Sequence, residues 1–135
     1  CDTLLLSVGL IPENELSRMA GVTMDPLTGG ASVNELLETD VAGIFSCGNV
    51  LHVNDYVDEV SAEGEIAARG ARQRIRGKSA GEENLIAVTG DDSIGQIVPQ
   101  AISGQRPVTF YVRVKRPMEK LILPELGHLV REARR

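Results

Sequence analysis

The sequence predicts a mixed α/β fold, and three of its segments support this prediction. Residues 3–8 (TLLLSV) are an almost entirely apolar run, which is typical of a parallel strand buried on both faces. Residues 55–76 repeat small and apolar side chains at helical spacing. Residues 108–114 (VTFYVRV) are rich in β-branched and aromatic residues, which favour a strand. We therefore expect a buried strand, a long helix and a β-rich C-terminal part.

The segments between the first strand and the long helix predict short elements. The first strand ends at Gly9, and residues 15–19 have room for about one helical turn. Residues 22–24 and 31–33 are β-like runs on either side of the turn sequence DPLTGG, so they predict a hairpin. Residues 44–45 supply the next strand.

The long helix is expected to pack through a narrow face of small and apolar residues. Acidic residues gather at its start and basic residues at its end, which complements the helix dipole. Glycines and a serine then end the helix and start a linker, so we divide the chain into residues 1–78 and 79–135. The residues of the expected face are Val60, Gly64, Ala67, Ala71 and Ile75.

The C-terminal part predicts a small β-rich unit. Residues 97–98 form a short apolar run before a proline, and residues 108–114 form the strongest strand pattern. Residues 121–123 are a further strand candidate, and residues 125–135 can form a helix.

Composition argues against several classes of function. A net charge of −5 and 3% aromatic residues disfavour a nucleic-acid surface, which needs positive charge and stacking rings. No apolar run approaches the roughly 20 residues of a membrane span, and the N-terminus lacks the layout of a signal peptide. We therefore expect a cytoplasmic protein. Because the chain starts inside its first expected strand, we also expect it to be the C-terminal part of a longer protein.

The thiols and imidazoles do not predict a redox or metal site. Cys1 and Cys47 are too far apart for a CxxC pair, and the composition disfavours a disulfide between them. We expect Cys47 to be a thiol buried behind a glycine turn. His52 is expected to be a loop histidine, because no companion ligands lie at suitable spacing, and His128 is expected to face solvent.

The stretch GIFSCGNV, residues 43–50, is the strongest candidate for a ligand contact. Its strand runs into Gly48, where the missing Cβ lets the backbone approach a ligand closely. The next side chain, Asn49, can both donate and accept hydrogen bonds. An ordinary exit from a strand into a turn is the alternative interpretation.

Two segments, taken together, resemble the pyridine nucleotide-disulfide oxidoreductase family. DTLLLSVGLIPEN (residues 2–14) resembles the segment that returns the chain from the NAD(P)H domain to the FAD domain. TDVAGIFSCGN (residues 39–49) resembles the second FAD motif, although the family usually has Asp where this chain has Asn49. HVND (residues 52–55) is similar to a branch described as thioredoxin-reductase-like or as NAD(FAD)-dependent dehydrogenases.

This resemblance implies a fold and a function for the two parts of the chain. Residues 1–78 would be a partial FAD/NAD(P)-binding Rossmann-like (β-β-α) domain fragment, and residues 79–135 a small β-rich C-terminal extension. FAD would be the cofactor and NAD(P)H the co-substrate. The residues implied to contact the ribityl chain and to form the helix end beneath the flavin are Gly48, Asn49, Val50, Val60, Ser61 and Ala62.

The sequence also limits what this chain is expected to do alone. No G-x-G-x-x-G follows a strand, and residues 90–95 (GDDSIG) lack the glycine spacing of a phosphate-binding turn. We therefore expect a catalytically inert chain that does not retain FAD without the N-terminal FAD and NAD(P)H segments of the same protein. A homo-oligomer or a partner oxidoreductase subunit also fits. The alternatives are a non-enzymatic docking or oligomerisation module, using residues 108–123, and an independent binder of small ligands.

Overall fold

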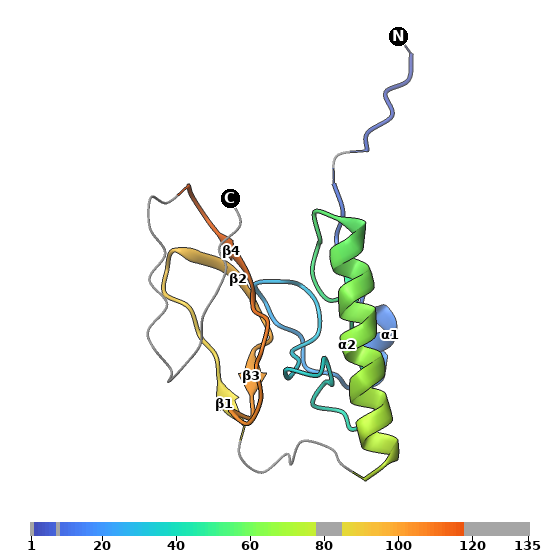
Figure 1. The fold of residues 1–135 in the computed structure, drawn as a ribbon. Coiled ribbons are helices and arrows are strands. Elements are labelled where there is room, and N and C mark those ends of the chain that lie inside the picture. Colours follow the sequence, from blue (N-terminus) through green and yellow to red (C-terminus); the bar gives the residue numbers. More distant parts are fainter. Residues whose placement is uncertain (1, 8, 78–84, 118–135) are drawn as a thin grey trace.

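The computed structural model describes residues 2–7, 9–77 and 85–117 (Figure 1). The expected strand at residues 121–123, the expected helix at residues 125–135, Cys1 and His128 lie outside the described residues. The fold mixes helix and sheet, as the sequence predicts at this coarse level. The elements in chain order are α1 (Glu15–Met19), the short 3₁₀ helix η1 (Gly48–Val50), α2 (Val57–Ile75), β1 (Ile86–Ala87), β2 (Ile94–Val98), β3 (Ala101–Ile102) and β4 (Tyr111–Val114).

The strands of the C-terminal part form two small antiparallel sheets. β1 pairs with β3, and β2 pairs with β4 so that Val98 lies opposite Tyr111. The strand expected at residues 108–114 is shorter than predicted, because β4 begins at Tyr111. Its partner β2 ends at Val98, and the following Pro99 has no amide hydrogen to continue the pairing.

The expectation of a buried first strand is wrong for the described residues 3–7. They make no strand pairing with any described residue, and Leu4, Leu5 and Leu6 are 80%, 91% and 71% exposed. Figure 1 shows this segment projecting away from the rest of the molecule. An apolar run becomes a central strand only when neighbouring strands pair with both of its edges, and the described part of the chain provides no such neighbour.

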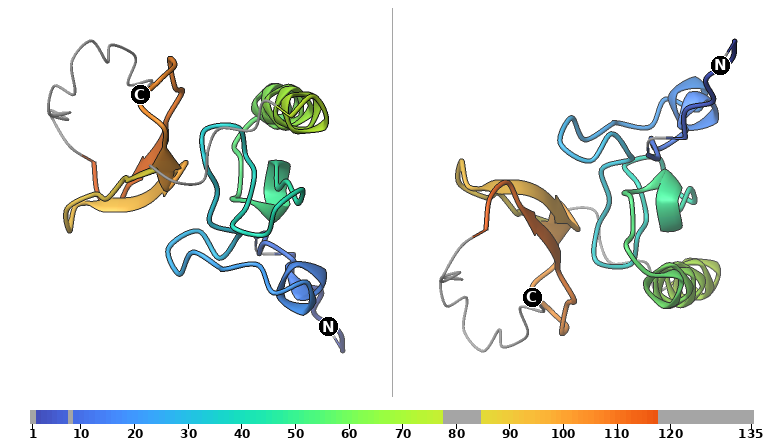
Figure 2. Two further views of the ribbon diagram at one scale, coloured as in Figure 1. Left: turned by 90° about the horizontal axis from the view of Figure 1, so that it is seen from below. Right: turned by 90° about the horizontal axis from the view of Figure 1, so that it is seen from above.

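Residues 21–56 lie between α2 and the β-strands, which Figures 1 and 2 show from three directions. The expected hairpin is present as a single antiparallel bridge between Met24 and Ala31, closed by the Asp25 carboxylate, which accepts the Thr28 amide hydrogen at 2.8 Å. The expected strand at residues 44–45 is likewise reduced to one bridge, between Glu38 and Phe45.

One hydrophobic core joins the two expected parts of the chain. Its buried cluster contains Val33 and Leu51 from the N-terminal part and Val98 from β2. Gln100 adds two hydrogen bonds to Val33. Its side-chain Oε1 accepts the Val33 backbone amide hydrogen at 2.9 Å, and its backbone amide donates to the Val33 carbonyl at 3.1 Å. The β-strands are thus packed against the segment that precedes η1.

α2 forms as the sequence predicts, and four of the five residues of its expected face are buried or half-buried. Its buried residues are Glu63, Ala67 and Gly70, whereas the expected face residue Ile75 is 87% exposed. The helix is closest to the core at Gly70, where a Cβ would lie 2.7 Å from the Leu36 carbonyl oxygen. A glycine is therefore required there, and this close approach fixes which side of the helix faces inward.

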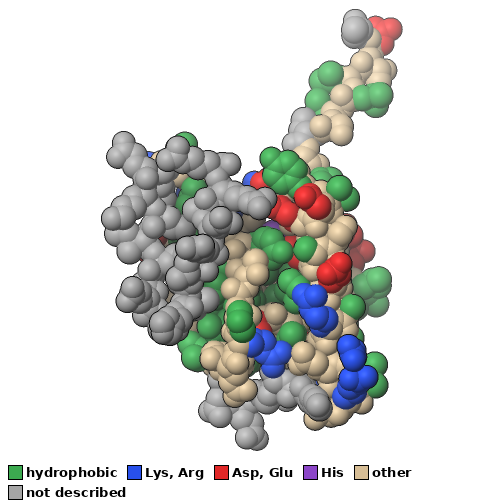
Figure 3. Space-filling view, in the orientation of Figure 1, with side chains coloured by type: hydrophobic (Ala, Val, Ile, Leu, Met, Phe, Trp, Pro, Cys, Tyr) green, Lys and Arg blue, Asp and Glu red, His purple; other side chains and the backbone are tan. Residues whose placement is uncertain are grey.

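The charges along α2 follow the predicted order. Asp58 and Glu59 lie in its first turn, and Arg72 and Arg74 lie in its last turn. Figure 3 shows acidic side chains over the first half of this helix and basic ones over the second half. Among the described residues, no helix combines the length and the apolar character needed to cross a membrane.

Candidate functional site

The turn at η1 requires a glycine at its first residue. The chain enters it extended at Cys47 and turns at Gly48, which is buried and has a φ of +72°. A Cβ at Gly48 would lie 3.1 Å from Cγ1 of Val60 in α2. The group that lies close to Gly48 is therefore Val60 of the helix, whereas the approach of a ligand to this backbone stays a prediction.

Asn49 projects from this turn into solvent. Its Oδ1 accepts the backbone amide hydrogen of Asn54 at 3.1 Å, which orients the side chain. Its Nδ2 makes no hydrogen bond with any described residue. The turn thus presents an oriented amide with two unused donor hydrogens at the surface.

The other predicted site residues fall into two groups. Val50 is half-buried, and its carbonyl accepts a hydrogen bond of 2.8 Å from Asn14 Nδ2, while Val60 packs against Gly48. Ser61 and Ala62 are exposed on α2, and the Ser61 hydroxyl donates to the Val57 carbonyl at 3.1 Å. The structure therefore places Val60 beside the turn and the next two residues on the accessible side of the helix.

The start of α2 favours an uncharged ligand. Tyr56 precedes the helix, and no hydrogen bond from its side chain caps the first turn. Free backbone amides there attract negative charge, but Asp58 and Glu59 in the same turn oppose an anion. A neutral ring or hydroxyl group suits this surface better than a phosphate does.

Glu63 is the polar residue of this region that sequence reasoning missed. Its side chain is 0% exposed, its Oε2 accepts the Gly48 amide hydrogen at 2.6 Å, and its Oε1 lies 2.7 Å from Nε2 of His52. His52 lies in a loop, as predicted, but it is only 7% exposed. The sequence held one signal that Glu63 is buried: it lies four residues before Ala67, so both residues share one face of the helix.

The Glu63 carboxylate influences two nearby groups. The pKa of the Cys47 thiol is raised, first by burial and then by the negative charge of Glu63. The pKa of the Tyr111 phenol is raised by burial and by the charges of Glu63 and Glu59. Cys47 therefore stays protonated at neutral pH. The expectation of a buried thiol is met only in part, because Cys47 is half-buried.

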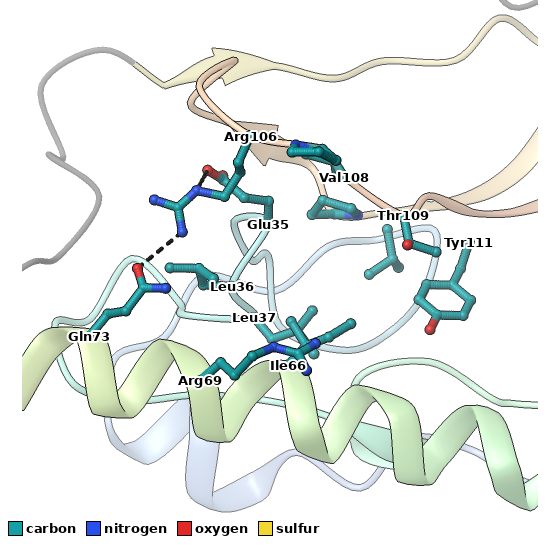
Figure 4. A pocket seen from close by; sticks show the side chains of 13 residues that line it. Glu35, Leu36, Leu37, Ile66, Arg69, Gln73, Arg106, Val108, Thr109 and Tyr111 are labelled. Atoms are coloured by element: carbon teal, nitrogen blue, oxygen red, sulfur yellow. Dashed lines mark hydrogen bonds and ion pairs between the residues drawn. The ribbon is translucent and has the colours of Figure 1, made fainter. Parts of the chain in front are cut away.

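A separate cavity of about 230 Å³ lies between α2 and the C-terminal strands (Figure 4). On one side Arg106 donates to Gln73 Oε1 at 3.0 Å and lies 3.5 Å from Glu35 Oε1. On the other side is Tyr111, whose ring centroid is 5.5 Å from that of His52. Cofactor pockets typically measure about 300–1,000 Å³, so this cavity is too small to hold a dinucleotide.

Within residues 2–7, 9–77 and 85–117, no group of three or more His, Cys, Asp or Glu side chains could hold a metal ion. No protein-family model, curated protein or solved structure matches this chain. The two resembling segments and the geometry of the η1 turn are therefore the basis for a functional proposal.

Proposed function

We propose that this chain supplies part of the flavin site of an FAD-dependent, NAD(P)H-linked oxidoreductase. The turn at η1 contacts the ribityl chain, and the first turns of α2 lie beneath the isoalloxazine ring. The observation that carries the proposal is the Gly48–Asn49 turn, because it presents an oriented side-chain amide beside the start of a helix. Other segments of the same protein supply the pyrophosphate and nicotinamide contacts.

The chemistry of the turn fits an uncharged hydroxyl group. Asn49 Nδ2 can donate to a ribityl hydroxyl, and this contact needs no negative charge at the position where the resembling family has Asp. Ser61 and Ala62 are exposed close to the start of α2 and are small enough for a planar ring to lie over them. FAD, when bound, supplies hydride transfer with the nicotinamide, whereas the residues of this chain bind and orient it.

The proposal is tested by following backbone amides of the full ¹⁵N-labelled chain by NMR during titration with FMN or FAD. We expect weak binding, in the millimolar range because most contacts are missing. The shift changes should be confined to Gly48, Asn49, Val50, Ser61 and Ala62, and NADH should not be oxidised.

Two variants make this titration specific. Asn49→Ala should abolish the shift changes, whereas Gln105→Ala, an exposed amide with no side-chain hydrogen bond to any described residue, should leave them unchanged. Shifts spread over the β-strands, or no shift at the turn, contradict the proposed contact. Tight stoichiometric binding with turnover by this chain contradicts the expectation that it holds only part of the site.

A second candidate function, self-association, is favoured by the exposed apolar side chains of the N-terminal segment. The sequence placed a docking surface at residues 108–123. β4 pairs with β2 along one edge and residues 118–123 lie outside the described residues, so this docking surface stays a prediction. Exposed apolar residues instead gather at the other end, where a second copy of the chain could cover them. They are Leu4, Leu5, Leu6, Leu10, Ile11, Leu16 and Met19.

Sedimentation velocity distinguishes this candidate. We expect the native chain to sediment as a dimer and the double variant Leu5→Ser/Ile11→Ser to sediment as a monomer. This result supports self-association through the N-terminal segment. Ile75→Ser is the matched control, because Ile75 is equally exposed but lies at the far end of α2. A chain that is monomeric at every concentration excludes the candidate.

A further inference from the structure

We propose that Glu63 and His52 are positioning residues of the Gly48–Asn49 turn, and that they leave the Asn49 side chain, not the Gly48 peptide, as the group that meets the ligand. The identity of that ligand rests on the flavin function proposed above. The positioning itself does not, because it is a property of the chain without ligand.

The contacts of Glu63 give the first argument. A carboxylate without solvent contact is costly unless its oxygens have partners. Here each oxygen has one: Gly48 N–H at 2.6 Å and His52 Nε2 at 2.7 Å. The first distance is typical of a charge-assisted hydrogen bond, which is stronger than one between neutral groups.

The second argument concerns what remains available at the turn. In many ligand-binding turns a backbone amide hydrogen is directed at the ligand. At this turn the Gly48 amide hydrogen points inward to Glu63, and the Gly48 carbonyl accepts from the amides of Leu51 and His52. Gly48 is therefore held from within, whereas no described residue accepts a hydrogen bond from Asn49 Nδ2.

The third argument concerns the proton of His52. With Glu63 as a carboxylate, Nε2 must carry the hydrogen that it donates, and both the neutral Nε2–H form and the imidazolium do so. The contact therefore survives protonation of the ring. The other titratable groups near the pair are Cys47, Glu59 of α2 and Tyr111 of β4.

Glu63→Gln tests this arrangement with almost no change in size. The amide can still accept from Gly48 and donate to His52, but only while Nε2 is unprotonated. Hydrogen exchange of the Gly48 amide, corrected for its intrinsic pH dependence, is measured at two pH values, one on each side of the His52 ring titration that NMR of the same variant records. Gly48 exchange in Glu63→Gln should be close to native at the higher pH value and at least ~tenfold faster than in the native chain at the lower one.

Controls separate positioning from general destabilisation. Glu65→Gln, on the same helix but 77% exposed, should behave as the native chain at both pH values. The Gln100 amide, which donates to the Val33 carbonyl at 3.1 Å, reports global opening, so only exchange at Gly48 should respond. His52→Leu should speed Gly48 exchange at both pH values, and His52→Gln, which keeps a donor, should restore protection.

The outcomes separate the two proposals. If the Gly48 amide is equally protected from hydrogen exchange in the native and Glu63→Gln chains at both pH values, the positioning role is overturned. This holds whether or not the chain binds flavin. When flavin is added to the native chain, we expect the Asn49 side-chain resonances to move more than the Gly48 amide, and the opposite order overturns the assigned ligand contact. If flavin moves no resonance, the flavin function fails while the exchange data still decide the positioning role.

Discussion

Gly48→Ala tests whether the turn is shaped by its contact with α2. The substitution has two costs that the structure separates. An alanine at a φ of +72° costs about 1–2 kcal/mol, because the left-handed region brings Cβ close to the following carbonyl. The new methyl group would also lie 3.1 Å from Val60 Cγ1, and relieving such overpacking costs about another 1 kcal/mol.

Gly21 provides a matched control for the first cost. Its φ is +80°, and a Cβ there would meet no atom within 4 Å. Gly21→Ala therefore measures the backbone cost alone, including any change in the unfolded chain. We expect it to lower the free energy of unfolding by about 1–2 kcal/mol, and Gly48→Ala by about 1 kcal/mol more.

A double-mutant cycle with Val60→Ala isolates the second cost. Val60→Ala removes the methyl group that the new Cβ would meet, so the double variant should be about 1 kcal/mol more stable than the sum of the single effects predicts. The assay is urea unfolding of the four chains, with the slope checked for constancy. If Gly48→Ala costs no more than Gly21→Ala, or if the cycle shows no coupling, the close packing of the turn on α2 is refuted.

Two further predictions use the titratable groups. The Thr23 hydroxyl donates a hydrogen bond of 2.5 Å to Asp40 and holds the pKa of that carboxyl below its ordinary value. This bond stabilises the folded chain at pH values above the pKa of Asp40 in the unfolded chain. The stabilisation is lost as the pH falls through the lower pKa of the folded chain. Thr23→Val should therefore lower the free energy of unfolding, measured in urea, by about 0.5 kcal/mol at neutral pH and leave it unchanged in strong acid. The control Thr89→Val, at an exposed position, should have no effect at either pH. An equal loss for Thr23→Val at both pH values contradicts the role of the Asp40 charge. Glu63→Gln removes the negative charge near Cys47, so it should lower the pKa of that thiol and speed its alkylation by iodoacetamide about threefold. The alkylation rate is measured on the peptide that contains Cys47. An unchanged rate contradicts the electrostatic contribution of Glu63.

The elements that could be predicted from sequence are those specified by local signals. The turn sequence around Asp25 predicted a hairpin, and its carboxylate closes that turn. The helix at Val57–Ile75 followed from periodicity and from the order of its charges. Gly48 was singled out because a glycine at the exit of a strand lets a ligand approach the backbone. The structure shows Val60 of α2 close to it, and the ligand contact stays a prediction.

The features that sequence reasoning missed depend on contacts between distant residues. Residues 3–7 carry the apolar signal of a buried strand, but burial requires neighbouring strands that this signal does not contain. Glu63 was not singled out from the sequence, because its partners His52 and Gly48 are found only once the chain folds back. The inward face of α2 was predicted only in part. Ala67 is buried as expected, but the predicted stripe did not include Glu63 or Gly70, which are also buried.

The bonds between Val33 and Gln100 have a consequence for how the molecule assembles. They join residues 67 positions apart, and the Ser103–Glu35 bond spans 68 positions. Local pieces such as α2 can form within microseconds, whereas closing such long loops delays the remaining contacts. During synthesis, residues 21–56 can therefore pack against α2 before their contacts with Gln100 and Ser103 form. Until these two residues have left the ribosome, chaperones and proteases have more access to the segment that carries the turn.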